Sequence, residues 1–152
     1  MDGSKPCRSC GKHSKTEADK RGRHALCARC RGRAQRKAAN ESVEAKARVI
    51  IRGIKYRGMS KSHKVTIDPL WIVTQWYKQH GRCIYSGRAM TLKFGPQSAS
   101  VDRRNPKKGY TPGNCALCCF DINRMKTDLS ERDFLSWCED VAAVLAAQEA
   151  SR

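Results

Sequence analysis

The segment from Ser100 to Lys126 contains oxygen-bearing side chains whose spacing could create a metal site. Its pattern predicts a strand, a turn-rich loop through Gly109-Tyr110-Thr111-Pro112-Gly113, a second strand and a helix. Asp102 lies at the end of the first predicted strand and Asn123 lies on the helix, so the loop can bring them together. A carboxylate and an amide oxygen are hard ligands that suit Mg²⁺ and Mn²⁺ equally well. We therefore expect a divalent-metal site here.

Cysteines near the N-terminus form a second pattern with a chemical meaning. Cys7-x-x-Cys10 and Cys27-x-x-Cys30 are separated by 16 residues, which is typical of a four-cysteine zinc site. Zn²⁺ prefers four ligands in a tetrahedron, and each Cys-x-x-Cys turn supplies two thiolates. His13 and His24 lie between the pairs and could replace a cysteine, but four cysteines already complete the shell. We predict one structural Zn²⁺ site.

The charge of the chain indicates a polyanionic partner. The 152 residues include 31 Lys and Arg against 14 Asp and Glu, a net charge of +17. Residues 1–64 hold 19 of the basic and 5 of the acidic side chains, whereas residues 65–152 hold 12 and 9. Basic side chains bind nucleic acids by attraction and by release of condensed counterions. The first half therefore fits a nucleic-acid-binding region, and a solvated tail is the alternative.

Basic side chains around the cysteines and in the loop after Asp102 are the candidates for contacts with DNA phosphates. They are Arg8, Lys12, Arg21, Arg23, Arg29, Arg31, Arg33, Arg104, Lys107 and Lys108. The basic half contains a single aromatic residue, Tyr56, and so offers few platforms on which unpaired bases could stack. A third hypothesis is a ribosome-associated or RNA-binding zinc protein. Because platforms for unpaired bases are few, double-stranded DNA is favoured over single-stranded RNA as the partner.

Helices before the predicted strands must help to position these groups. Asn40 can cap a helix that runs to about Arg57, with Gly58 as its stop. A second helix begins near Asp68-Pro69 and ends before Gly81. Side chains expected on the buried faces are Val43, Ala47, Ile50, Ile51 and Ile54 in the first helix, and Leu70, Trp71, Val73, Trp76 and Tyr77 in the second.

Two further helices are predicted in the C-terminal part, one from Cys119 to Lys126 and one after Ser130. The apolar face of the last one consists of Phe134, Leu135, Cys138, Val141 and Leu145. The longest apolar run, Val141–Ala147, is far shorter than the ~20 residues that span a bilayer, and no hydrophobic leader is visible. We expect a cytoplasmic protein of a bacterium or phage-infected host, in which the nine cysteines bind metal or stay as thiols.

The segment that carries Asp102 resembles the ββα-metal motif of HNH endonucleases. The resemblance is to the variant that has Asp-Arg, here Asp102-Arg103, where most members have Asp-His, as in some restriction and phage-encoded enzymes. It extends through Lys108-Gly109-Tyr110, Asn114 and Asn123-x-Met-Lys and covers roughly residues 81–138. It implies an α+β fold, with a small ββα-metal (HNH) nuclease core, flanking helices and an N-terminal four-Cys zinc module.

Roles and domain limits follow from the same resemblance. Asp102 and Asn123 would bind the catalytic Mg²⁺ or Mn²⁺, Asn114 would brace the loop through its backbone, and Lys126 would face the substrate phosphate. The implied domains are a basic zinc-binding module at 1–39, a helix and linker at 40–65, and the HNH nuclease domain at 66–152.

Arg103 departs from the common pattern because arginine does not deprotonate in proteins and cannot activate water. It can instead contact a phosphate oxygen. The first candidate for the base is Tyr85, which matches a tyrosine of similar sites but needs a nearby cation to lower its pKa. His63 is the second candidate, because the ordinary pKa of histidine suits a base.

Two further turns have only the first cysteine of a Cys-x-x-Cys pair, namely Cys83-x-x-Ser86 and Cys119-x-x-Ile122. Related HNH proteins hold a second Zn²⁺ with such turns. We expect packing to replace that ion, with Cys83, Cys119 and Ile122 buried close together. The alternative is a metal bound by Cys118 with Cys83 and Cys119.

The sequence therefore predicts a metal-dependent endonuclease that hydrolyses phosphodiester bonds of DNA. One such site cuts one strand, so double-strand cleavage would require a homodimer. The rival hypothesis is a zinc-containing DNA-binding protein whose HNH site has degenerated.

Overall fold

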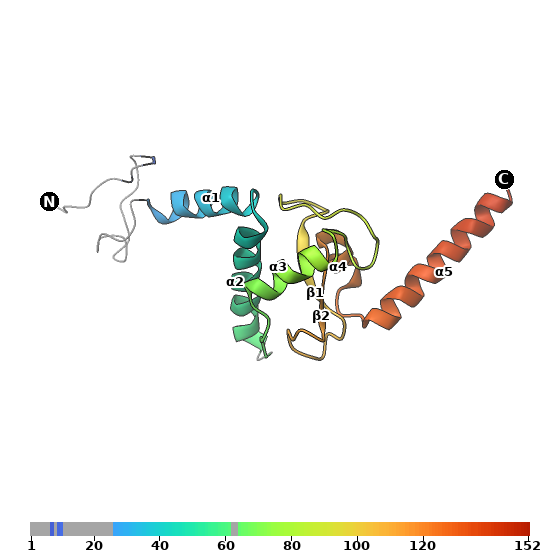
Figure 1. Cartoon of the computed structure of the whole chain (residues 1–152). Coiled ribbons are helices and arrows are strands. Elements are labelled where there is room, and N and C mark those ends of the chain that lie inside the picture. Colours follow the sequence, from blue (N-terminus) through green and yellow to red (C-terminus); the bar gives the residue numbers. More distant parts are fainter. Residues whose placement is uncertain (1–6, 8, 11–25, 62–63) are drawn as a thin grey trace.

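The computed structural model describes residues 7, 9–10, 26–61 and 64–152. Helices α1 to α3 span Ala28–Ala39, Val43–Lys61 and Pro69–Lys78, strands β1 and β2 span Ala99–Arg103 and Cys115–Cys119, and helices α4 and α5 span Phe120–Lys126 and Glu131–Ala150. Helices and a two-stranded sheet make this an α+β fold, as predicted (Figure 1).

The unit that positions the candidate site is β1, a loop, β2 and α4, the order predicted from the sequence. The strands are antiparallel, with Asp102 opposite Ala116 and Arg103 opposite Cys115. Every residue of β2 is buried, and α4 begins directly after Cys119. Helix α4 packs on both strands, so its residues meet those of β1 although the loop separates them in sequence.

One hydrophobic core joins this unit to α2 and α3. It includes Ile51 and Ile54 of α2, Ile72 of α3, Val101 of β1 and Leu117 of β2. Helix α2 packs on α3, and α3 contacts β2. Helix α2, which was predicted to belong to a separate segment of helix and linker at 40–65, therefore shares one core with the strands.

Helix α3 begins as predicted, because the Asp68 carboxylate accepts a hydrogen bond from the Trp71 amide at 2.8 Å. Its buried face agrees with the prediction only in part, because three of the five predicted side chains pack against the core: Trp71, Val73 and Trp76. Ile72 is its fully buried residue, whereas Leu70 and Tyr77 are 70% and 62% exposed. These two side chains are seven residues apart and share the helix face that points away from the core.

The first two helices also differ from the sequence prediction. Helix α1 was not predicted, although its alanine, arginine, glutamine and lysine residues have high helix propensity. Ser42, rather than Asn40, accepts the capping hydrogen bond of α2, at 3.1 Å from the Ala45 amide. Helix α2 continues through Gly58 to Lys61, since a single glycine weakens a helix without ending it.

Helix α5 begins after Ser130 as predicted, and Ser130 caps it, because Ser130 Oγ accepts from the Asp133 amide at 3.2 Å. Phe134 is buried, but Leu135, Cys138, Val141 and Leu145 are exposed, so most of the predicted buried face is wrong. Figure 1 gives the reason: α5 leaves the rest of the molecule after its first turn and extends into solvent. Among the described residues, no helix is long and apolar enough to cross a bilayer.

Candidate active site

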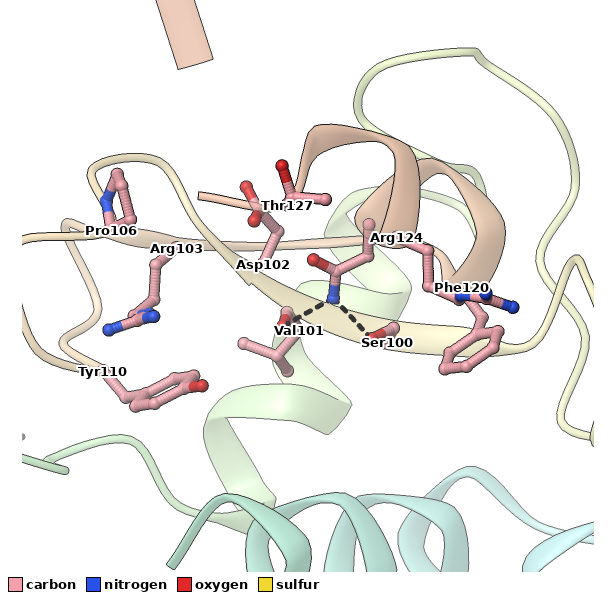
Figure 2. Close-up of a pocket in the computed structure, with 10 residues that line it drawn as sticks. Ser100, Val101, Asp102, Arg103, Pro106, Tyr110, Phe120, Arg124 and Thr127 are labelled. Atoms are coloured by element: carbon pink, nitrogen blue, oxygen red, sulfur yellow. Dashed lines mark hydrogen bonds between the residues drawn. The ribbon is translucent and has the colours of Figure 1, made fainter. Parts of the chain in front are cut away.

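A pocket of about 320 Å³ lies where β1 meets α4 (Figure 2). Asp102 and Asn123, the two predicted metal ligands, both line it. The full lining is Ser100, Val101, Asp102, Arg103, Pro106, Tyr110, Phe120, Asn123, Arg124 and Thr127. The antiparallel pairing and the packing of α4 therefore bring together the two residues that the sequence separates.

Asp102 is the only carboxylate in this lining, and it is 4% exposed. Lys126 Nζ lies 3.3 Å from its Oδ1, and the Tyr85 hydroxyl donates to its Oδ2 at 2.6 Å. A buried carboxylate needs such partners to remain charged. The two contacts fix the carboxylate at the pocket wall, and each oxygen keeps a lone pair for a further partner.

Lys126 does not face the pocket, contrary to the sequence prediction. Its side chain is fully buried. Besides Asp102, its ammonium group donates to the carbonyl oxygens of Arg103 at 2.9 Å and Leu129 at 2.7 Å. The three donors of the ammonium group are thereby used, so the lysine holds Asp102 and the end of α4 and does not contact a phosphate.

Asn123 is held by its amide nitrogen. Nδ2 donates to Ser100 Oγ at 2.7 Å and to the Val101 carbonyl oxygen at 3.1 Å (dashed lines in Figure 2). Within the part of the chain that the structure describes, no group donates to its Oδ1, which is left for a ligand. A carboxylate and an amide oxygen at one pocket fit a hard divalent ion that keeps several waters, as Mg²⁺ does.

Asn114 makes the backbone contacts that were predicted for it. Its Oδ1 accepts from the Asn105 amide, and its Nδ2 donates to the carbonyl oxygens of Asn105 and Gly109, all at 3.0 Å. These bonds close the loop between β1 and β2. A Cβ at Gly109 would collide with the Lys64 carbonyl oxygen, so this loop also needs glycine at its contact with residue 64.

Arg103 lies beside the pocket with its guanidinium over the ring of Tyr110, 5.0 Å from the ring centroid. It also reaches the Lys108 carbonyl oxygen at 3.4 Å. A cation–π contact with an aromatic ring orients the guanidinium, whose N–H groups stay available to donate in the guanidinium plane. This arrangement suits contact with a phosphate oxygen.

Tyr85 adjoins the site from behind Asp102 and does not line the pocket. Its ring packs against Phe134 with centroids 5.6 Å apart. Burial and the neighbouring Asp102 carboxylate raise the pKa of Tyr85 well above its usual range. The sequence prediction required the metal or Arg103 near this hydroxyl, and the hydroxyl is hydrogen-bonded to Asp102, one of the two predicted metal ligands. His63, the other candidate base, lies outside the described residues.

Several predicted DNA contacts can be located. Arg104 has an internal partner, because its Nη1 lies 2.6 Å from Glu131 Oε1, so it joins the loop to α5 rather than pointing freely at DNA. Lys107 and Lys108 are exposed on that loop, and Arg29, Arg31 and Arg33 lie on α1. Arg8, Lys12, Arg21 and Arg23 lie outside the described residues.

Seven of the ten lining residues were not candidates from the sequence, and the side chains of three of them bear on the site: Ser100, Tyr110 and Arg124. Ser100 orients Asn123, and Tyr110 supports Arg103. Arg124 carried a signal that could have been used, since it directly follows Asn123 just as Arg103 directly follows Asp102.

The predicted zinc ligands form a cluster. The four Sγ atoms of Cys7, Cys10, Cys27 and Cys30 lie within 4.8 Å of one another. The Cys27 amide donates to Cys7 Sγ at 3.2 Å, a contact that stabilises a thiolate. The cluster can hold a tetrahedral ion such as Zn²⁺, and the spacing prediction is confirmed at the level of the cluster.

We expect the purified chain to contain one Zn²⁺ and to lose most of it when Cys27 is replaced by serine, because a buried hydroxyl is a poor substitute for a thiolate. Metal content by mass spectrometry measures this directly. The matched control is Cys138→Ser on exposed α5, which should keep the ion. Equal zinc content in the two variants would contradict the assignment.

Cys83 and Cys119 are buried together, and Ile122 packs against the same core, as predicted. Burial raises the pKa of Cys119 to about 11 and that of Cys115 to about 12, so both remain protonated thiols that behave as small apolar side chains.

No family model matches the sequence, and no curated protein matches it. A search of solved structures finds the rare-cutting HNH restriction endonuclease PacI, with a TM-score of 0.47 and 19% sequence identity. The match covers 95% of this chain and 97% of that one. Function must therefore be argued from the site itself.

Proposed function

We propose that this protein is a divalent-metal-dependent DNA endonuclease of the HNH type, which hydrolyses phosphodiester bonds. The observation that supports this most is the meeting of Asp102 and Asn123 at one pocket, with Arg103 beside them. The order of strand, loop, strand and helix around that pocket is the one that the sequence resemblance implies. The resemblance and the geometry therefore both favour Asp102 and Asn123 as the metal ligands.

Asp102 and Asn123 would hold Mg²⁺ or Mn²⁺ through the carboxylate and the amide Oδ1. Such an ion, when bound, stabilises negative charge on a phosphate and on the leaving oxygen. The chain itself supplies the positions of the two ligands. Lys126 and Tyr85 fix the carboxylate, and Ser100 fixes the amide group.

Arg103 would contact an oxygen of the scissile phosphate, and its stacking on Tyr110 keeps it in place. Asn114 holds the loop that carries these groups. Tyr85 and His63 are the candidates to activate water. For Tyr85 this requires its hydroxyl to turn from Asp102 towards the attacking water.

Duplex DNA is the proposed partner, because the net charge of +17 favours a polyanion and the basic half has a single aromatic residue, Tyr56, on which a base could stack. The four-cysteine cluster would be structural. One pocket per chain would cut one strand, so cutting of both strands would require two copies of the chain.

A second candidate function is DNA binding without catalysis. It is favoured by the contacts of Asp102, since both of its oxygens already accept hydrogen bonds from Tyr85 and Lys126. It is also favoured by Arg103, which replaces the usual histidine and cannot act as a base. Such a protein would bind DNA with or without Mg²⁺ and would cut none.

Incubation with supercoiled plasmid, bacterial genomic DNA and a branched DNA junction, with and without Mg²⁺ or Mn²⁺, tests the proposal. We expect strand cleavage of at least one substrate that depends on added metal. The products also distinguish nicking from double-strand cleavage. A preparation that shifts these DNAs in a gel but cuts none of them with either metal would instead support the binding protein.

A further inference from the structure

The pocket is bordered by two arginines, each of which lies over an aromatic ring. Arg103 stands over Tyr110 with 5.0 Å to the ring centroid, and Arg124 stands over Phe120 with 5.8 Å. All four residues line the pocket. In Figure 2 the two pairs lie on opposite sides of Asp102.

The two arginines are placed by different elements but in an equivalent way. Arg103 follows Asp102 on β1, and Arg124 follows Asn123 on α4. Each candidate metal ligand is therefore followed by an arginine that reaches the same pocket. An arginine placed on the surface without a role in the site would not be expected both to follow a candidate ligand directly and to line the same pocket.

Both arginines carry positive charge that no carboxylate offsets. In the described ranges, the ion pairs are Arg104–Glu131, Lys126–Asp102 and Arg132–Asp133, and none includes Arg103 or Arg124. Lys126 already balances the charge of Asp102, the only acidic side chain in the lining. The pocket therefore presents two uncompensated guanidinium groups, which suits an anion with more than one charge.

The aromatic rings explain how an exposed arginine could be held in one orientation. A guanidinium over a ring is attracted by the ring face, and its N–H groups remain free to donate. Phe120 is partly buried at the start of α4, and its amide donates to the Ser98 carbonyl oxygen at 2.8 Å, which fixes the backbone of that residue. The ring is thus a firm support for Arg124.

We propose that Arg124, supported by Phe120, is a second phosphate-contacting residue, so that a DNA strand is bound at two phosphates, one on each side of the Asp102–Asn123 pair. The idea that the strand is cut between them rests on the proposed function. The binding itself does not, and it can be measured separately.

The test is the salt dependence of DNA binding by Arg124→Gln, followed by fluorescence anisotropy with a labelled random-sequence duplex and no added divalent metal. The slope of log K against log salt is negative, and each lost phosphate contact reduces its magnitude by ~0.9. We expect this loss of slope and about a tenfold weaker Kd at low salt for that variant, as for loss of one ionic contact worth about 1.4 kcal/mol. Arg132→Gln on α5 is the matched control, because its side chain is 94% exposed outside the pocket, and its slope should equal that of the wild type.

Phe120→Leu tests the support of the guanidinium without changing any charge. We expect its salt slope to stay near that of the wild type and its Kd to weaken about threefold, the equivalent of ~0.6 kcal/mol, as for an exposed cation–π contact. An Arg124→Gln slope equal to that of Arg132→Gln would overturn the proposal. This outcome is independent of catalysis, since a chain that never cuts DNA can still lose the contact, and a nuclease can keep cutting without it.

Discussion

Replacing Asp102 by asparagine is expected to reduce metal-dependent DNA cleavage by at least about 1,000-fold, or about 4 kcal/mol of transition-state stabilisation. The carboxylate is the only anionic side chain in the lining, so its loss removes the charge that attracts the cation. Asparagine preserves the shape of the side chain, and its single amide oxygen can still accept a hydrogen bond at one of the two positions that now face Lys126 and Tyr85. The initial rate of plasmid cleavage measures the effect.

The matched control is Asp121→Asn, which removes a carboxylate from exposed α4 outside the pocket and should cleave at the rate of the wild type. DNA binding by the Asp102 variant should persist, because binding depends on the basic side chains. Cleavage by Asp102→Asn within tenfold of the wild-type rate, in a preparation free of other nucleases, would show that Asp102 does not bind the catalytic ion.

Replacing Lys126 by methionine is expected to lower the free energy of unfolding by about 3–5 kcal/mol, as for other buried ion pairs that lose one partner. The substitution leaves a buried carboxylate at Asp102 without its cation and leaves the carbonyl oxygens of Arg103 and Leu129 without a donor. Methionine has a similar length, so little of the loss comes from a cavity. Urea unfolding monitored by circular dichroism measures it.

Two comparisons separate the charge from the packing. Lys78→Met on the exposed part of α3 should change the free energy of unfolding by less than about 0.5 kcal/mol. The double variant Asp102→Asn with Lys126→Met removes both charges and should recover much of the lost stability. If Lys126→Met alone costs less than about 1 kcal/mol, the lysine is not the buried partner of Asp102 in solution.

Much of the local structure could be predicted because local rules decide it. The helix starts at Asp68 and Ser130 could be predicted, since the side chain that caps a helix acts within three residues of itself. The four-cysteine cluster was readable because two short turns of known spacing can close on one ion. The order of strand, loop, strand and helix followed from the turn residues between apolar runs.

Local rules also failed once, since α2 is capped by Ser42 instead of Asn40 and continues through Gly58. Other failures concern side chains whose surroundings come from distant parts of the chain. The apolar face of α5 was predicted from its periodicity, but the core ends near Phe134 and leaves Val141 and Leu145 exposed. Periodicity shows which residues share a face and not whether another element covers that face.

The sequence by itself determined which residues could do chemistry and which elements carry them: the cysteine pairs, Asp102 on a strand, and Asn123 on the helix after the next strand. Only the tertiary structure decided where these groups point. It buried Lys126 against Asp102, turned the Tyr85 hydroxyl to the same carboxylate, and brought Arg124 to the pocket opposite Arg103. The physical reason is the distance along the sequence over which each interaction acts. Helix caps and cysteine turns involve near neighbours, whereas the contacts of Asp102 with Tyr85 and Lys126 join residues more than 15 positions apart.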